Sequence, residues 1–158
     1  ERDVKFLVVP HEIDAVTLRE VQEKIPAKSL LYTECTADTD FTDVQVLVVN
    51  ILGSLSRIYR YGNWAYVGGG FTAYLHSVIE PAVYGIPVAF GPRIERKTTP
   101  KEMVHRGIGA IVTTPEGLCY WFNQVREVRE QEDVKSRATA FIEANANFTQ
   151  KVCANIGQ

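Results

Sequence analysis

A histidine, a serine and a glutamate lie close together near the middle of the sequence, at His76, Ser77 and Glu80. They follow three consecutive glycines at positions 68–70, which remove every Cβ from a chain reversal and allow positive φ. We expect a helix to begin near Ser77, where the first backbone N–H groups have no intrahelical partner and form an anion site. The stretch from Trp64 to Pro92 is therefore predicted to bind a phosphorylated ligand.

The spacing of Ser77 and Glu80 leaves two interpretations open. The pair matches a capping box, in which a serine caps a helix and a glutamate three residues later reaches back to the cap N–H. Alternatively, Glu80 accepts hydrogen bonds from two ribose hydroxyls, while His76 and the preceding amides lie near a phosphate. The two interpretations could each hold for different residues of the group.

Two earlier segments could also contact a ligand. His11 follows an apolar run and is either a donor to a phosphate or carboxylate, or a loop histidine bonded to nearby backbone. The tripeptide Gly53-Ser54-Leu55 is either a backbone platform against a base or sugar, or a helix start capped by Ser54. The spacing favours the cap.

A charged segment after position 92 contains Arg93, Arg96 and Lys97, which could meet a carboxylate or phosphate. A run of charges in a loop is more often solvated, and the sequence favours that interpretation.

Composition and missing motifs exclude several classes of protein. There is no GxGxxG or P-loop lysine, which disfavours an NAD-dependent enzyme, and no GxSxG elbow or metal-ligand spacing. The three cysteines fit free thiols in a reducing compartment better than a disulfide framework or a zinc site. A net charge of −2 without a charged block does not suggest a nucleic-acid surface, and no apolar run reaches the length of about 18 residues that a membrane span needs.

Six short apolar segments predict strands, at residues 4–10, 30–33, 44–49, 64–67, 87–90 and 110–113. The first is continuous, as is typical of a strand covered on both faces. Helices are predicted at 15–24, with Asp14 as cap, and at 55–61, near Ser77, 100–106, 115–126, 131–144 and 145–157. This alternation indicates an α/β fold with a Rossmann-like, doubly wound parallel six-stranded sheet, whose ligand sites lie at the carboxyl ends of the strands. We expect residues 1–158 to form one domain cut from a longer protein.

Several segments resemble the carboxyl-terminal half of the 3-deoxy-D-manno-octulosonic acid (Kdo) transferases, most closely the forms of Bacteroides-type bacteria. The resemblance is carried by VGGGF at 67–71, His76, IEPAVYGIPV at 79–88 and FGP at 90–92. Supporting segments in the same order are VPHEID at 9–14, GSLSRIYRYG at 53–62 and the tail at 141–156. The resemblance therefore covers nearly the whole chain.

The resemblance implies the donor-binding domain of a GT-B glycosyltransferase, an enzyme with two Rossmann-like domains that face each other across a cleft. The family transfers Kdo from CMP-Kdo to a lipid A precursor during lipopolysaccharide biosynthesis, at the cytoplasmic face of the bacterial inner membrane, without a metal or other cofactor. Its catalytic glutamate, its acceptor site and its membrane contact lie in the amino-terminal domain. The resemblance thus implies a soluble fragment that binds donor weakly, has no catalytic residue of its own and is inactive alone.

The resemblance also implies which residues bind the donor nucleotide: His11, Gly53, Ser54, Leu55, His76, Ser77 and Glu80. The histidine at 11 would lie by the nucleotide, and the backbone at 53–55 would line the cytosine. The pair at 76–77 would approach the phosphate, and the glutamate at 80 would hold the ribose hydroxyls.

Two alternatives to a Kdo transferase domain remain. One is a GT-B glycosyltransferase domain that uses a UDP-sugar. The other is a divergent, non-catalytic Rossmann-like binding module. Its main support is that Tyr74 and Leu75 stand where the family usually has glycine, with bulk that could narrow the approach to the phosphate.

Overall fold

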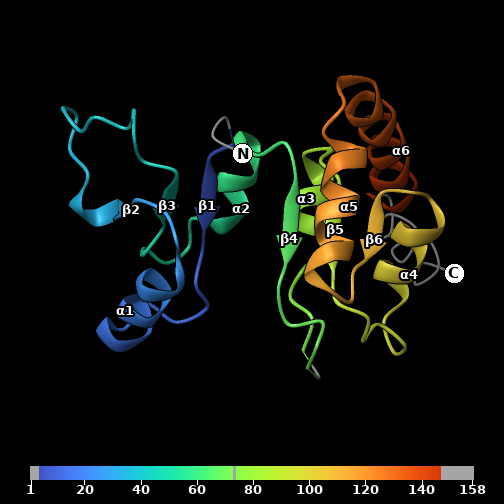
Figure 1. The fold of residues 1–158 in the computed structure, drawn as a ribbon. Coiled ribbons are helices and arrows are strands. Elements are labelled where there is room, and N and C mark those ends of the chain that lie inside the picture. The colour runs from blue at the N-terminus through green and yellow to red at the C-terminus, as the bar shows by residue number, and fades with distance from the viewer. Residues whose placement is uncertain (1–3, 73, 147–158) are drawn as a thin grey trace, which may run out of the picture. The chain divides into compact units, whose positions relative to one another are not determined.

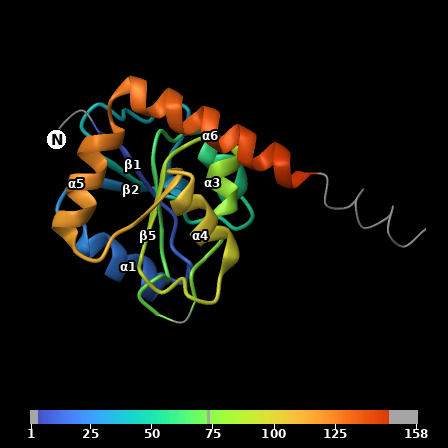
Figure 2. The same cartoon turned by 90° about the vertical axis from the view of Figure 1, so that its right-hand side faces the viewer.

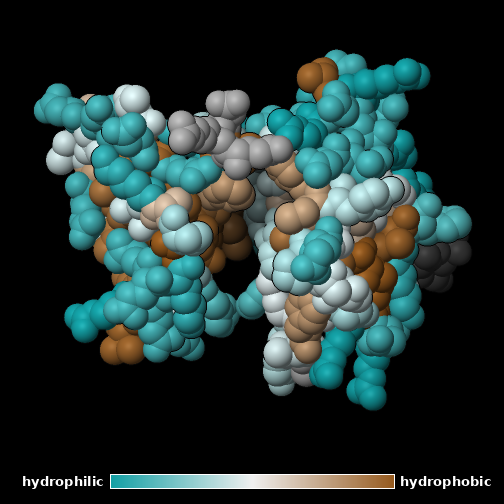
Figure 3. All heavy atoms as spheres, viewed as in Figure 1, coloured by the Kyte–Doolittle hydropathy of each residue, from teal (hydrophilic) through white to brown (hydrophobic). Residues whose placement is uncertain are grey.

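The computed structural model describes residues 4–72 and 74–146 as an α/β protein with two compact units, Glu1–Leu55 and Ser56–Gln158. Each unit contains one three-stranded sheet in which all neighbouring strands are parallel (Figure 1). On the face shown in Figure 3, most of the surface of both units is hydrophilic, with smaller hydrophobic areas. Within the described ranges, no helix combines the length and apolar character needed to cross a bilayer.

The sheet of the first unit has the order β1-β3-β2, formed by β1 (Phe6–Val8), β2 (Ser29–Leu31) and β3 (Val46–Val48). The residues Val8, Val48 and Leu31 are in register across it, and helix α1 (Ala15–Lys24) supplies Leu18 to the same small core. A 3₁₀ turn, Tyr32–Glu34, follows β2.

The start of α1 is fixed by a side-chain cap. The carboxylate of Asp14 accepts hydrogen bonds from the backbone N–H of Val16 at 3.0 Å and of Thr17 at 3.1 Å, and from the Thr17 hydroxyl at 2.6 Å. These bonds lower the pKa of Asp14, with the Thr17 hydroxyl as the largest cause. The predicted cap is confirmed, and α1 has the predicted bounds.

The sheet of the second unit has the order β4-β5-β6, formed by β4 (Ala65–Val67), β5 (Val88–Phe90) and β6 (Gly109–Ile111). The helix α2 (Leu55–Ile58) spans the unit boundary and continues as a 3₁₀ turn at Tyr59–Tyr61. The other helices of this unit are α3 (Ile79–Val83), α4 (Thr98–His105), α5 (Pro115–Val125) and α6 (Val128–Ala146). Helix α6 packs against α3 and α5, as Figure 2 shows.

The core of the second unit is the larger of the two. Its central strand β5 is wholly buried, and Phe90 is the largest of the fully buried side chains. Met103 of α4 and Phe141 of α6 pack into the same cluster. This core therefore joins the sheet to helices that come from the far end of the described chain.

The expectation of a single six-stranded sheet is wrong, because β1 pairs only with β3 and β4 pairs only with β5 among the described strands. Each sheet is stabilised by its own apolar cluster, and three-residue strands contribute few ladder hydrogen bonds. The expectation that the first strand is covered on both faces is also wrong, since Phe6 is 49% and Leu7 43% exposed.

Most helix predictions need small corrections. Helix α4 begins at Thr98, two residues before the proline that was expected to open it, because proline is tolerated throughout the first turn of a helix. The helix predicted at 131–144 is part of the longer α6, which also includes the first two residues of the tail predicted at 145–157, while the rest of that tail lies outside the described residues. The helix after the glycines begins at Ile79, later than Ser77.

Two glycines allow the loops after β4 and β5 to cross. A Cβ on Gly70 would lie 2.6 Å from the backbone N of Gly91, and a Cβ on Gly91 would lie 2.5 Å from the carbonyl carbon of Gly70. The backbone N–H of Arg93 then donates to the carbonyl oxygen of Gly70 at 2.9 Å. Because the contacts are between backbone atoms, side-chain rotation cannot relieve them.

We predict that Asp14→Ala lowers the melting temperature of the first unit by a few degrees near neutral pH, whereas Asp14→Asn keeps most of the stability because asparagine also caps helices. The folded-state pKa of Asp14 is lowered, so its stabilisation is present above its unfolded-state pKa and is lost as the pH falls through the folded-state value. Thermal melts at about pH 7 and about pH 3 should show the deficit of Asp14→Ala shrinking in acid. A deficit independent of pH would contradict this role of the carboxylate.

We predict that Gly70→Ala destabilises the protein by about 1 to 3 kcal/mol, the usual cost of forcing extra atoms into a packed region. Gly68→Ala is the matched control, because the nearest atom to its added Cβ is His76 Cδ2 at 4.0 Å. The control should change the free energy of unfolding by less than about 0.5 kcal/mol. Urea denaturation measures both variants, and equal losses would show that the loop crossing is not the constraint.

Candidate functional site

The loop after β4 folds back on itself beside the glycines. Gly69 has φ +89°, and a Cβ there would lie 1.7 Å from the carbonyl oxygen of Tyr74, so only glycine fits. The N–H and hydroxyl of Thr72 both donate to the Gly69 carbonyl at 3.0 Å, and the N–H of His76 donates to the Gly68 carbonyl at 3.2 Å. This turn holds the His76 backbone at the carboxyl end of β4.

His76, Ser77 and Glu80 lie in one short segment of the second unit that follows the glycine turn and includes the start of α3. His76 and Ser77 are exposed, and Glu80 is half-buried in the first turn of α3. The N-cap of α3 is Val78, with no side-chain cap hydrogen bond. The capping-box interpretation of Ser77 and Glu80 is therefore wrong, because the start of α3 has no side-chain cap hydrogen bond.

The charge of Glu80 acts on a neighbouring tyrosine. The pKa of Tyr59 is raised, first by burial of its ring and second by the negative charge of Glu80. Tyr59 lies in the 3₁₀ turn after α2 and packs against the core of the second unit. Glu80 thus lies beside a half-buried phenol whose neutral O–H form is favoured.

The bulk of Leu75 does not narrow the approach to this segment. Leu75 is 5% exposed and belongs to the core cluster, whereas Tyr74 is 79% exposed. Two buried residues, Leu75 and Val78, lie on either side of the exposed pair His76 and Ser77. The two apolar residues therefore anchor the polar pair.

The sequence favours a solvated charged run for Lys97 over contact with an anion, and the residue is exposed, but its side chain has a defined partner. The Nζ of Lys97 donates to the carbonyl oxygen of Leu75 at 3.0 Å. The loop after β5 is thereby bonded to the loop after β4 at the residue before His76. The charge of Lys97 was visible in the sequence, but no local pattern identifies a partner 22 residues away.

The remaining candidates lie in the first unit. His11 follows β1, and Gly53, Ser54 and Leu55 follow β3. Because β1 and β3 are paired and parallel, both segments follow the carboxyl ends of adjacent strands, as predicted. The Ser54 hydroxyl donates to the carbonyl oxygen of Ile51 at 3.3 Å, and Gly53 has φ +73° with no atom within 4 Å of an added Cβ.

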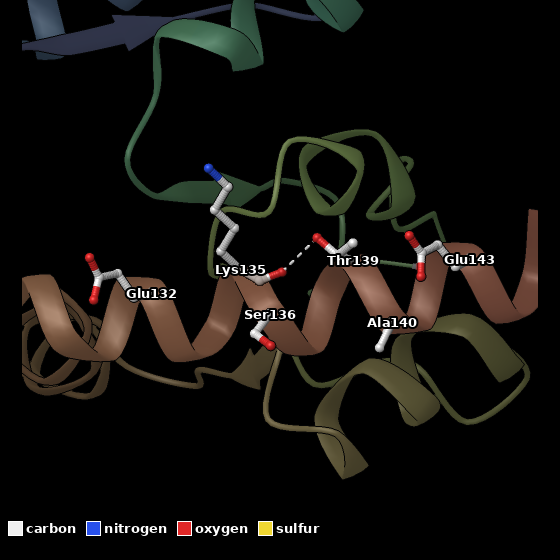
Figure 4. A pocket seen from close by; sticks show the side chains of 6 residues that line it. All are labelled: Glu132, Lys135, Ser136, Thr139, Ala140 and Glu143. Carbon is white, nitrogen blue, oxygen red and sulfur yellow. Dashed lines mark hydrogen bonds between the residues drawn. The ribbon is translucent and has the colours of Figure 1, made fainter.

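Two hollows in the surface of the described residues are lined by other residues than these. One runs along α6 and is lined by a single helix, so it is a helix face rather than an enclosed pocket (Figure 4). Its lining residues are Glu132, Lys135, Ser136, Thr139, Ala140 and Glu143. The other lies in the first unit, around the 3₁₀ turn after β2, and includes Cys35. Among the residues that the structure describes, no group of three acidic, histidine or cysteine side chains could hold a metal ion.

Comparison with solved structures shows a fold already known. The crystal structure of the C-terminal CMP-Kdo binding domain of WaaA from Acinetobacter baumannii matches 89% of this chain and 74% of that domain, with a TM-score of 0.72 and 18% sequence identity. The Rossmann-like α/β fold predicted from the sequence is confirmed by this likeness.

Comparison with curated sequences gives a consistent result, although no protein-family model matches the chain. The chain is 30% identical over 118 residues to 3-deoxy-D-manno-octulosonic acid transferase from Chlamydia pneumoniae, which covers 73% of the chain and 25% of the relative. It is 25% identical over 138 residues to the enzyme of the same name from Aquifex aeolicus, which covers 85% of the chain and 37% of the relative. The chain thus spans only about a quarter of the length of the first protein and a little over a third of the second. The chain therefore belongs to the family of Kdo transferases, as its sequence relatives show.

Proposed function

We propose that this chain binds CMP-Kdo and is the donor-binding domain of a Kdo transferase. The observation that carries the proposal is the position of the segment with His76, Ser77 and Glu80, directly after a glycine turn at the carboxyl end of β4, in a chain of this family. Carboxyl ends of parallel strands are where α/β folds bind nucleotides. Support also comes from the structural neighbour, which is the CMP-Kdo binding domain of WaaA.

In this proposal each polar group meets the part of the donor that its chemistry suits. Glu80 accepts hydrogen bonds from the two ribose hydroxyls, since a carboxylate has two acceptor oxygens. His76 and Ser77 donate to the phosphate. The failure of the capping-box interpretation supports this role, because the serine and the glutamate are then not paired for a structural purpose.

The chemistry assigned to the domain is stabilisation of a leaving group. Transfer of Kdo breaks the bond between its anomeric carbon and the phosphate oxygen, and the electron pair leaves with CMP. Donors placed around the phosphate lower the barrier by stabilising the charge that develops there. In this proposal a second, amino-terminal domain supplies the general base and binds the lipid A precursor. The transfer takes place at the cytoplasmic face of the inner membrane.

In the first unit, His11 and the backbone at residues 53–55 are proposed to contact the nucleotide. Their place after paired parallel strands supports a ligand role. The positive φ of Gly53 and its open surroundings would let a base approach the backbone closely. Packing of Leu75 into the core removes part of the support for the non-catalytic module, and Tyr74, which is exposed, is the part that is left.

Isothermal titration with CMP and UDP distinguishes this proposal from a UDP-sugar transferase domain. We expect the chain to bind CMP at least about tenfold more tightly than UDP, equivalent to about 1.4 kcal/mol. Uridine lacks the exocyclic amino group of cytosine, so a site built to pair with that group rejects it. Preference for UDP would contradict the assignment of the donor.

We predict that Glu80→Ala weakens CMP binding about tenfold, because hydrogen bonds to a charged group contribute about 1.5 to 3 kcal/mol. The variant should bind 2′,3′-dideoxycytidine monophosphate as well as the parent chain does, since that ligand lacks both hydroxyls. Titration of both ligands, with a thermal melt to verify folding, tests the role. Equal losses for the two ligands would mean that Glu80 is structural.

A further inference from the structure

A lysine side chain joins the two loops that the proposed phosphate site depends on. Lys97 follows β5, and its Nζ donates to the carbonyl oxygen of Leu75 after β4 at 3.0 Å. Leu75 is bonded covalently to His76, which precedes Ser77. The ammonium group is therefore held at the carbonyl oxygen of the peptide bond that joins Leu75 to His76, one of the residues proposed to meet the phosphate.

Both ends of this bridge are anchored by the core of the second unit. The acceptor residue Leu75 is buried, and so is Ile94, whose carbonyl accepts a hydrogen bond from the Lys97 N–H at 2.9 Å. The loop that carries Lys97 is further tied to Gly70 through the N–H of Arg93. A cation on an anchored backbone loses less freedom when it binds a ligand, which favours affinity.

Among the described residues, no ion pair is found between the Lys97 ammonium and a carboxylate. Ion pairs there include those of Lys24 with Glu20, Arg106 with Glu102 and Arg137 with Glu130. An ammonium group has three N–H donors, of which one goes to a neutral carbonyl. It therefore has both charge and donors for an anion at residues 76–77.

We infer that the Lys97 ammonium binds the phosphate of the donor nucleotide, and that its bond to Leu75 places it there. The inference rests on the proposed function and adds to it a side chain that the sequence resemblance does not assign. The short helix α3 is a poor anion site by itself, because it has only five residues and one of them, Pro81, has no N–H. A lysine side chain supplies the positive charge that such a helix lacks.

The test compares a ligand that has the phosphate with one that lacks it. CMP and cytidine are titrated into the chain and into the variants Lys97→Met and Lys97→Gln. Glutamine has no charge but keeps an N–H that can donate to the Leu75 carbonyl. Lys101→Met is the matched control, because Lys101 also donates to a loop carbonyl, that of Glu95, and its loss changes the net charge equally.

We expect both Lys97 variants to bind CMP about tenfold more weakly and cytidine unchanged, since a charged hydrogen bond to the phosphate is lost. The dependence of CMP affinity on salt should weaken in the same variants, because salt screens the attraction between charges. Lys101→Met should bind both ligands as the parent chain does. Thermal melts verify that each variant is folded, and Lys97→Gln provides the test if Lys97→Met is not.

Three results would overturn the inference: unchanged CMP affinity in both variants, equal losses for CMP and cytidine, or normal CMP binding by Lys97→Gln. The last two would mean that Lys97 only holds the loop in place. A failure of the proposed function looks different. If the chain prefers UMP to CMP, the assignment of the donor fails, while the same comparison of UMP with uridine still decides whether Lys97 binds the phosphate.

Discussion

The backbone contact between Gly70 and Gly91 is the constraint on which the candidate site of the second unit depends. A Cβ on either residue would overlap backbone atoms of the other, so the loops after β4 and β5 can cross here only if both residues are glycine. The hydrogen bond from Arg93 to Gly70 and that from Lys97 to Leu75 both span this crossing. Removing the crossing would separate the groups that the two loops bring together.

The core fixes the polar residues indirectly, by burying their neighbours. Leu75 and Val78 pack inward on either side of His76 and Ser77, and Ile94 does the same for the loop of Lys97. Burial of each apolar side chain contributes about 1.5 to 3 kcal/mol, more than the roughly 0.5 to 1.5 kcal/mol of a hydrogen bond between neutral groups. Apolar burial therefore sets where the polar groups of the site lie, and the hydrogen bonds refine their orientation.

The two units differ in how much core they have. The first unit has only Leu18, Val46 and Val48 as buried members of its cluster, and its strand β1 leaves Phe6 and Leu7 exposed. The second unit buries all of β5 and adds side chains from α4 and α6. Apolar burial is the dominant favourable term in folding, so the second unit is the better stabilised of the two.

The sequence by itself determined the features that depend on near neighbours in the chain. Helix α1 with its Asp14 cap and helix α5 from Pro115 follow from capping residues and local pattern. The alternation of short apolar runs with helices was sufficient for the parallel α/β fold, and the stretch around the glycines was sufficient for the family.

Only the tertiary structure decided that the strands form two sheets, that Ser77 does not cap α3, that Leu75 is buried and that Lys97 bonds to the residue before His76. Each of these depends on atoms that are distant in sequence or on the position at which a helix begins after a folded loop. Local propensity does not carry that information, because the energy of such contacts comes from packing and hydrogen bonding between separate segments.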